Sequence, residues 1–228
     1  MTWFYRYNAV LRTALVFVAL LFLGNILPLA RLQAQTCGCT NCPQAIADNT
    51  TVDLYVQVSN ATNATLGQNG QGVCGVLLNF DHDYLGDLSI KLKSPTGQVV
   101  TLVGPQGFWG PTTFTNWNIS FFQCGDVALP DGGFSATWNS DQIWGAAGNY
   151  NGSYYPFSGC LENLNIGPVN GTWTLTVSDA EGEDLGIFYD YQIIFCDPTG
   201  VACFSCLADA GNLLQPDVVA CQGASSLK

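Results

Sequence analysis

Several short segments of this chain alternate apolar and polar side chains with a period of two. Residues 88–93 (Leu-Ser-Ile-Lys-Leu-Lys) and 172–178 (Thr-Trp-Thr-Leu-Thr-Val-Ser) follow this pattern most strictly, and residues 52–58 also follow it. Successive side chains of a β-strand point to opposite faces of a sheet, so this period separates the apolar set from the polar set. The pattern therefore predicts strands that bury one face.

Other segments complete a predicted all-β fold. Residues 73–80 are nearly all apolar, which is typical of a central strand. The turn Ser94-Pro95-Thr96-Gly97 has proline and glycine where a type I turn favours them, so residues 98–103 are expected to pair with the strand before it. Strands are also expected at residues 116–122, 134–138 and 187–195, and residues 145–159 are interpreted as a surface loop. We expect a jelly-roll β-sandwich of about eight antiparallel strands, supported by disulfides.

The N-terminal residues have the layout of a secretory signal peptide. Arg6 and Arg12 precede an apolar stretch that begins at Ala14, and Ala34 offers a small residue for cleavage. A membrane anchor is the alternative, but the stretch is at the short limit for spanning a bilayer and is interrupted by glycine, asparagine and proline. We expect residues 1–35 to be a signal peptide, so the protein is secreted or on the cell surface and meets the membrane only through this signal.

The rest of the chain is expected to form three parts. Residues 36–49 are a cysteine-rich stub, residues 50–197 are the β-sandwich domain, and residues 198–228 are a cysteine-containing linker. The end of this linker is similar to the opening of Ig-like repeats in large secreted bacterial proteins. We therefore expect the linker to contain the start of a truncated repeat, and the chain to be a fragment or a truncated reading frame.

Charge excludes one class of function. Without residues 1–35 the chain keeps all 17 acidic side chains against Lys91, Lys93 and Lys228, a net charge near −14. Such a surface repels phosphate backbones, so we expect no nucleic-acid binding. It favours divalent cations or basic partners.

Ten cysteines behind an export signal favour disulfides. They are Cys37, Cys39, Cys42, Cys74, Cys124, Cys160, Cys196, Cys203, Cys206 and Cys221. Links between the cysteine-rich flanks of the strand region are expected, but the spacing does not give the connectivity. The alternative is a four-thiolate zinc site made of Cys39, Cys42, Cys203 and Cys206.

Catalytic patterns are missing from the sequence. A Ser-His-Asp triad needs a histidine base, and the chain has one histidine, His82. No Gly-x-Ser-x-Gly segment marks a nucleophile. We expect no catalytic residue in this chain and no activity of the chain alone.

Two acidic segments are candidate metal sites. Asp81, Asp83 and Asp87 lie in the first segment, and Asp179, Glu181 and Asp184 in the second. Calcium takes six to eight oxygen ligands, which acidic turns supply, so a structural calcium is a candidate cofactor. The alternative is solvated acidic loops.

Aromatic side chains among Asn- and Gly-rich segments are candidate glycan-binding residues. The candidates are Trp109, Trp144 and Tyr154, because carbohydrate-binding sandwiches use aromatic platforms beside amide groups. The alternative is that these rings pack over the edges of the sandwich.

Two blocks of sequence resemble a known family. The first contains His82, Tyr84 and Gly86-Asp87-Leu88 before the turn at residues 94–97. The second runs from Gly171 to Asp179 as Gly-x-Trp-x-Leu-x-Val-x-Asp and continues to Asp184-Leu185-Gly186. In this order and spacing they resemble the P domain (P/Homo B domain) of kexin- and furin-like proprotein convertases. Cys74, Cys124, Cys160 and residues 145–159 depart from the family pattern, as does Tyr191, where the family usually carries tryptophan.

The resemblance implies a fold and a role. The family's P domain is a jelly roll that accompanies a subtilisin-like serine endopeptidase domain, supports its stability and carries no catalytic residue. It implies structural roles for His82, Gly86, Trp173 and Gly186. We therefore expect a secreted, non-catalytic module associated with proteolysis, whose partner is a subtilisin-like catalytic domain or other domains of a longer protein. The alternative is an adhesion or carbohydrate-binding module of a cell-surface protein, with glycans as ligands.

Overall fold

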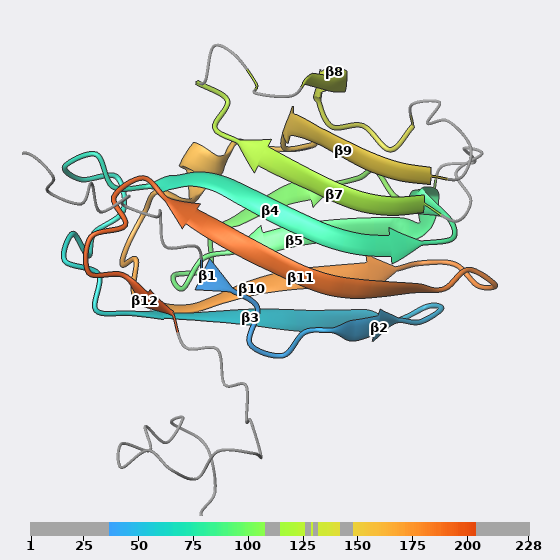
Figure 1. The fold of residues 1–228 in the computed structure, drawn as a ribbon, viewed down its shortest axis with the longest axis horizontal. Coiled ribbons are helices and arrows are strands. Elements are labelled where there is room, and N and C mark those ends of the chain that lie inside the picture. Colours follow the sequence, from blue (N-terminus) through green and yellow to red (C-terminus); the bar gives the residue numbers. More distant parts are fainter. Residues whose placement is uncertain (1–36, 108–114, 126–128, 130–131, 142–147, 204–228) are drawn as a thin grey trace, which may run out of the picture. The chain divides into compact units, whose positions relative to one another are not determined.

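The computed structural model describes residues 37–107, 115–125, 129, 132–141 and 148–203 (Figure 1). These residues form two β-sheets that pack face to face, with two short 3₁₀ helices, η1 (Leu85–Asp87) and η2 (Leu161–Leu164). The all-β sandwich expected from the alternating segments is confirmed.

The larger sheet has seven strands within the described residues, in the order β1-β11-β4-β7-β9-β8, with β2 also paired to β11. Its strands are β1 (Cys37–Gly38), β2 (Gln44–Ile46), β4 (Val73–His82), β7 (Thr115–Phe122), β8 (Gly132–Thr137), β9 (Gly148–Tyr155) and β11 (Gly186–Phe195). The apolar segment at residues 73–80 lies in β4, between β11 and β7, as a central strand should.

The smaller sheet has the order β12-β3-β10-β5-β6 in the described residues. Its strands are β3 (Thr51–Ser59), β5 (Leu88–Lys93), β6 (Val99–Val103), β10 (Gly171–Asp179) and β12 (Ala202–Cys203). The strictly alternating segments form β5 and β10, which pair antiparallel, and β3 pairs with the other edge of β10. The inward residues of β10, Trp173, Leu175 and Val177, are fully buried.

The expectation of antiparallel strands and of a loop at residues 145–159 is wrong in one region. β9 lies inside the expected loop, and it pairs parallel with both β7 and β8. The Tyr150 ring stacks on the Trp117 ring with centroids 4.9 Å apart. Pairing on both edges and this stacking stabilise a strand whose Gly- and Asn-rich sequence has low strand propensity.

Aromatic rings fill much of the core between the sheets. Trp173 meets Phe195 edge-on with centroids 5.6 Å apart, and its indole Nε1 donates to the carbonyl of Val169 over 3.0 Å. Tyr191 is buried, and its hydroxyl donates to the carbonyls of Leu54 (3.1 Å) and Trp173 (3.2 Å) of the opposite sheet. A tyrosine at this position therefore joins the two layers through hydrogen bonds.

Four disulfides join the described cysteines, none of which is free. They are Cys37–Cys203, Cys39–Cys42, Cys74–Cys196 and Cys124–Cys160, with Cα–Cα distances between 5.0 and 5.6 Å. These distances suit disulfides. The first bond links the two cysteine-rich flanks, as expected, and the zinc alternative is wrong because Cys39, Cys42 and Cys203 are oxidised.

Some sequence-based expectations fall outside the described residues. They concern the signal peptide, Cys206, Cys221 and the truncated repeat. Within the described residues, no helix has the length and apolar character needed to cross a membrane.

Candidate functional site

An open pocket of about 440 Å³ lies where two connections pass between the sheets. One connection leads from β4 through η1 to β5, and the other leads from β10 to β11. The two connections lie side by side because the strands of one are paired with the strands of the other. β4 pairs with β11 in one sheet, and β5 pairs with β10 in the other. The pairs Asp179–Leu88 and Gly186–His82 mark the ends of these ladders and fix the two acidic segments next to each other.

Backbone hydrogen bonds hold the two connections together. The Asp83 amide donates to the carbonyl of Leu185 over 3.0 Å, and the Ala180 amide donates to the carbonyl of Asp87 over 3.1 Å. The Gln106 side-chain amide also donates to the Asp87 carbonyl, over 3.0 Å. The position of the Asp87 side chain is therefore set by fixed backbone on both sides.

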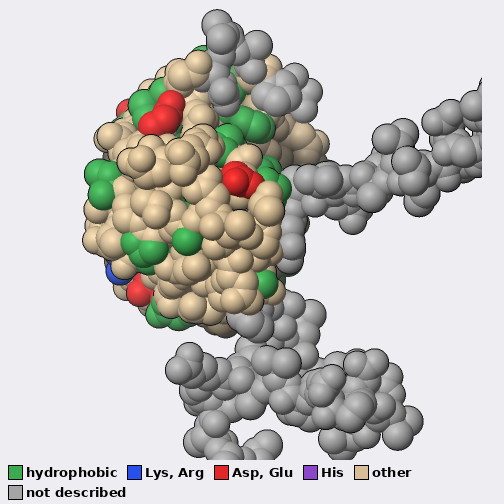
Figure 2. All heavy atoms as spheres, turned by 90° about the vertical axis from the view of Figure 1, so that its left-hand side faces the viewer, with side chains coloured by type: hydrophobic (Ala, Val, Ile, Leu, Met, Phe, Trp, Pro, Cys, Tyr) green, Lys and Arg blue, Asp and Glu red, His purple; other side chains and the backbone are tan. Residues whose placement is uncertain are grey.

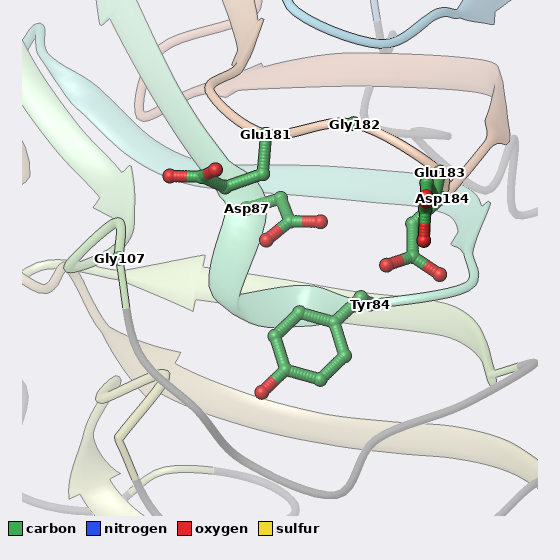
Figure 3. Close-up of a pocket in the computed structure, with 7 residues that line it drawn as sticks. All are labelled: Tyr84, Asp87, Gly107, Glu181, Gly182, Glu183 and Asp184. Atoms are coloured by element: carbon green, nitrogen blue, oxygen red, sulfur yellow. The ribbon is translucent and has the colours of Figure 1, made fainter.

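Four carboxylates line this acidic pocket. The lining residues are Tyr84, Asp87, Gly107, Glu181, Gly182, Glu183 and Asp184. Figure 3 shows the Asp87 side chain between that of Glu181 and those of Glu183 and Asp184. Among the described residues, His82 and Asp179 are the only basic and acidic side chains within ion-pair distance, so no lysine or arginine of this part of the chain pairs with a carboxylate of the pocket.

Asp87 is the most unusual of these carboxylates. Its exposed fraction is 4%, and its Oδ2 atom is buried with no hydrogen-bond partner. Burial is the main cause that raises the pKa of Asp87 to about 7, because a desolvated carboxylate favours its neutral form. The further causes are the negative charges of Asp179, Asp184, Glu181 and Asp48.

The pKa of the Asp184 carboxyl is raised as well. Burial is the largest cause of its raised pKa, and the His82 ring acts in the opposite direction. Nearby, the Asp48 Oδ2 accepts a hydrogen bond from the Glu183 amide over 3.1 Å, while the Asp48 Oδ1 is buried without a partner. The pocket thus concentrates negative charge that the described protein groups do not compensate.

A buried His82–Asp179 pair lies beside Asp87. The His82 Nε2 lies 2.9 Å from the Asp179 Oδ2, and the Tyr84 amide donates to Nδ1 over 3.1 Å. Asp179 Oδ1 accepts from the amides of Glu181 (3.0 Å) and Asn49 (3.4 Å). In a catalytic triad the second ring nitrogen faces a nucleophile. Here it faces the backbone of Tyr84, so the pair holds the two connections in place.

The other acidic candidates lie elsewhere. Asp81 does not line the pocket, since its carboxylate accepts from the Ile187 amide over 2.6 Å and from the Tyr189 hydroxyl. Asp83 and Asp179 are also absent from the lining, although the charges of both contribute to the raised pKa of Asp184. Asp179 lies behind the pocket, with a carboxylate oxygen within 4.8 Å of one of Asp87.

The structural candidates lie where close packing leaves little space. Gly86 is buried within η1, and Trp173 is buried in the core. A Cβ atom at Gly186 would lie 2.7 Å from the His82 ring and closer still to the Asp81 carbonyl. A side chain at this position would therefore displace the His82–Asp179 pair.

The expected role of Tyr154 as an exposed ligand platform is wrong. Its exposed fraction is 1%, and its ring packs edge-on against Trp138 with centroids 5.0 Å apart. Trp109 and Trp144 lie outside the described residues.

Asp48, Tyr84 and Gly107 were not among the site residues predicted from the sequence. Asp48 and Gly107 are far from the two acidic segments in sequence, and no local pattern marks them. Gly107 reaches the pocket through tertiary structure, since its amide donates to the Gly86 carbonyl over 2.8 Å. Asp48 does not line the pocket, but it accepts a hydrogen bond from the amide of the lining residue Glu183.

Comparison with known proteins gives one family match. The model of the proprotein convertase P-domain family matches residues 73–195, more than half of the chain, from β4 to β11. Among curated proteins none matches the sequence. Among solved structures, the complex of the Aeromonas sobria serine protease with its chaperone matches with a TM-score of 0.35 and 17% identity. This match covers 78% of the present chain and 29% of that chain.

Proposed function

Because this chain belongs to the proprotein convertase P-domain family, we propose that it is a non-catalytic module that packs against a subtilisin-like serine endopeptidase domain and stabilises it. The observation that carries the proposal is the family match across the central strands of both sheets. The His82–Asp179 pair supports it, since both ring nitrogens of His82 are engaged in holding the fold.

Disulfides support a location outside the cell. Four of them cross-link the described residues, and such bonds persist in oxidising compartments. We therefore propose that residues 1–35 direct export and that the module acts in a secreted or surface protein.

One apolar strip is suited to contact with a catalytic domain. Leu185, which directly precedes β11, and Ile187 and Tyr189 at the start of β11 are spaced two residues apart, as side chains on one face of a strand are, and they are 57%, 41% and 39% exposed. On the face of the molecule shown in Figure 2, hydrophobic side chains form small separate patches. Three large exposed apolar side chains at alternate positions are a more continuous contact surface, of the kind that marks interfaces between domains.

The test is a binding and stability measurement with a subtilisin-like catalytic domain encoded by the same source organism. We expect the chain to form a complex on size-exclusion chromatography and to lengthen the half-life of that domain at elevated temperature. Ile187→Asp should weaken the complex at least about tenfold, the loss that about 1.4 kcal/mol produces. Val99→Asp, an exposed position on β6 of the other sheet, is the matched control and should bind normally. If the chain forms a complex with none of these catalytic domains, the proposal is contradicted.

The glycan-binding alternative stays a prediction that rests on Trp109 and Trp144. Among the described residues, the tyrosine assigned to it is buried, so no observation favours this function over the first.

A further inference from the structure

An oxygen atom of Asp87 lacks a partner in a site that is otherwise closely hydrogen-bonded. The Oδ2 atom is buried and accepts no hydrogen bond, although the neighbouring Asp179 carboxylate accepts three. A buried carboxylate oxygen without a partner is destabilising. Since Asp87 lines the acidic pocket, a cation that enters the pocket meets its carboxylate.

A second carboxylate lies within reach of the same cation. One ligand atom from each of His82, Asp87 and Asp179 lies within 4.8 Å of the others. Calcium–oxygen distances are about 2.3–2.6 Å, so two oxygens up to about 5 Å apart can bind one calcium ion. The backbone hydrogen bonds at both connections hold Asp87 and Asp179 in this arrangement.

The His82 ring does not offer a nitrogen to a metal. The carboxylate of Asp179 can only accept a hydrogen bond, so the Nε2 that faces it carries the proton. The other nitrogen, Nδ1, faces the backbone of Tyr84. The donor set of the pocket is therefore all oxygen, which suits hard cations such as calcium rather than zinc.

Further carboxylates surround the pocket without a compensating positive charge. Glu181, Glu183 and Asp184 line it, and they come from the connection between β10 and β11. Calcium accepts irregular sets of six to eight oxygens, whereas magnesium requires a near-ideal octahedron. An open pocket lined by several carboxylates thus favours the larger ion.

We propose that this pocket binds a calcium ion, with Asp87 and Asp179 as inner ligands and with Glu181 and Asp184 contributing directly or through water. The ion gives the Asp87 Oδ2 atom a partner and offsets part of the surrounding negative charge. Because it bridges η1 and the β10–β11 connection, it stabilises the place where the chain passes twice between the sheets. The inference does not depend on the proposed function, since it concerns the chain alone.

The test is calcium binding to the purified chain with its disulfides intact. Isothermal titration with CaCl₂ should give one saturable site with a Kd of about 10⁻⁴–10⁻³ M, as in extracellular calcium modules. The melting temperature should rise in about 10 mM Ca²⁺ relative to a chelator, and Mg²⁺ or NaCl at equal ionic strength should give less than half of that rise.

Variants assign the site. Asp87→Asn keeps the side-chain shape and should raise the Kd at least about tenfold, and the double variant Glu181→Gln/Asp184→Asn should also weaken binding. The double variant leaves the buried residues intact, so it keeps the test decisive if Asp87→Asn does not fold. Asp141→Asn removes one exposed carboxylate outside the pocket and should bind calcium normally.

Several outcomes overturn the proposal. They are the absence of saturable binding at millimolar Ca²⁺, equal stabilisation by NaCl or Mg²⁺, and equal weakening by Asp141→Asn. Tighter binding of Zn²⁺ that is lost in His82→Gln would also overturn it, since the ring would then be a ligand.

Discussion

At the scale of the residue, Asp87 makes stability depend on pH. Its pKa of about 7 in the folded protein exceeds the ordinary value of 3.8, so the folded state binds more protons between these values. The stability of the metal-free protein should therefore fall as pH rises from about 4 to about 7. Asp87→Asn should flatten this dependence and raise the melting temperature at about pH 8 by several degrees, with little change at about pH 4. Calorimetry in metal-free buffer measures both effects, and an unchanged pH profile would contradict the assigned burial. The sequence predicts that acidic residues gather here, but the missing partner of Oδ2 depends on atomic positions that no local pattern encodes.

At the scale of the element, β10 is the middle strand of the smaller sheet and contributes buried residues to the core. It lies between β3 and β5, and Trp173 fills the space between the sheets. Trp173→Ala should lower the free energy of unfolding by about 3–5 kcal/mol in urea titrations, through a cavity and the lost hydrogen bond to Val169. Tyr55→Ala, on the exposed side of β3, should change it by about 0.5 kcal/mol or less, and equal losses would contradict the assigned packing. Alternation predicted β5 and β10 well, because one buried face imposes a period of two. It missed β9, since that strand depends on its neighbours and on the Trp117–Tyr150 stack rather than on its own composition.

At the scale of the whole molecule, the disulfides differ in the length of chain that they close. Cys37 and Cys203 are 166 residues apart, whereas Cys39 and Cys42 are three apart. A longer closed loop restricts the unfolded state more, so Cys37→Ala/Cys203→Ala should lower stability by about 2–5 kcal/mol. Cys39→Ala/Cys42→Ala should have a clearly smaller effect, and the reverse order in thermal melts would contradict this ranking. The number of cysteines predicted disulfides. The pairing of Cys37 with Cys203 could not be predicted, because it depends on the sheets that bring β1, beside β11, close to β12, beside β3.

The Cys37–Cys203 bond also has a mechanical consequence. β1 and β12 are the first and last strands of the described sandwich, and a covalent bond joins them. A pulling force that enters at residue 37 and leaves at residue 203 passes through sulfur rather than through the hydrogen bonds of either sheet. While this bond is oxidised, tension along a longer polypeptide or between anchored neighbours stretches only the flanking chain. The sandwich itself therefore carries no force while the disulfide is intact, and tension can unfold it only after a reductant has cleaved this bond.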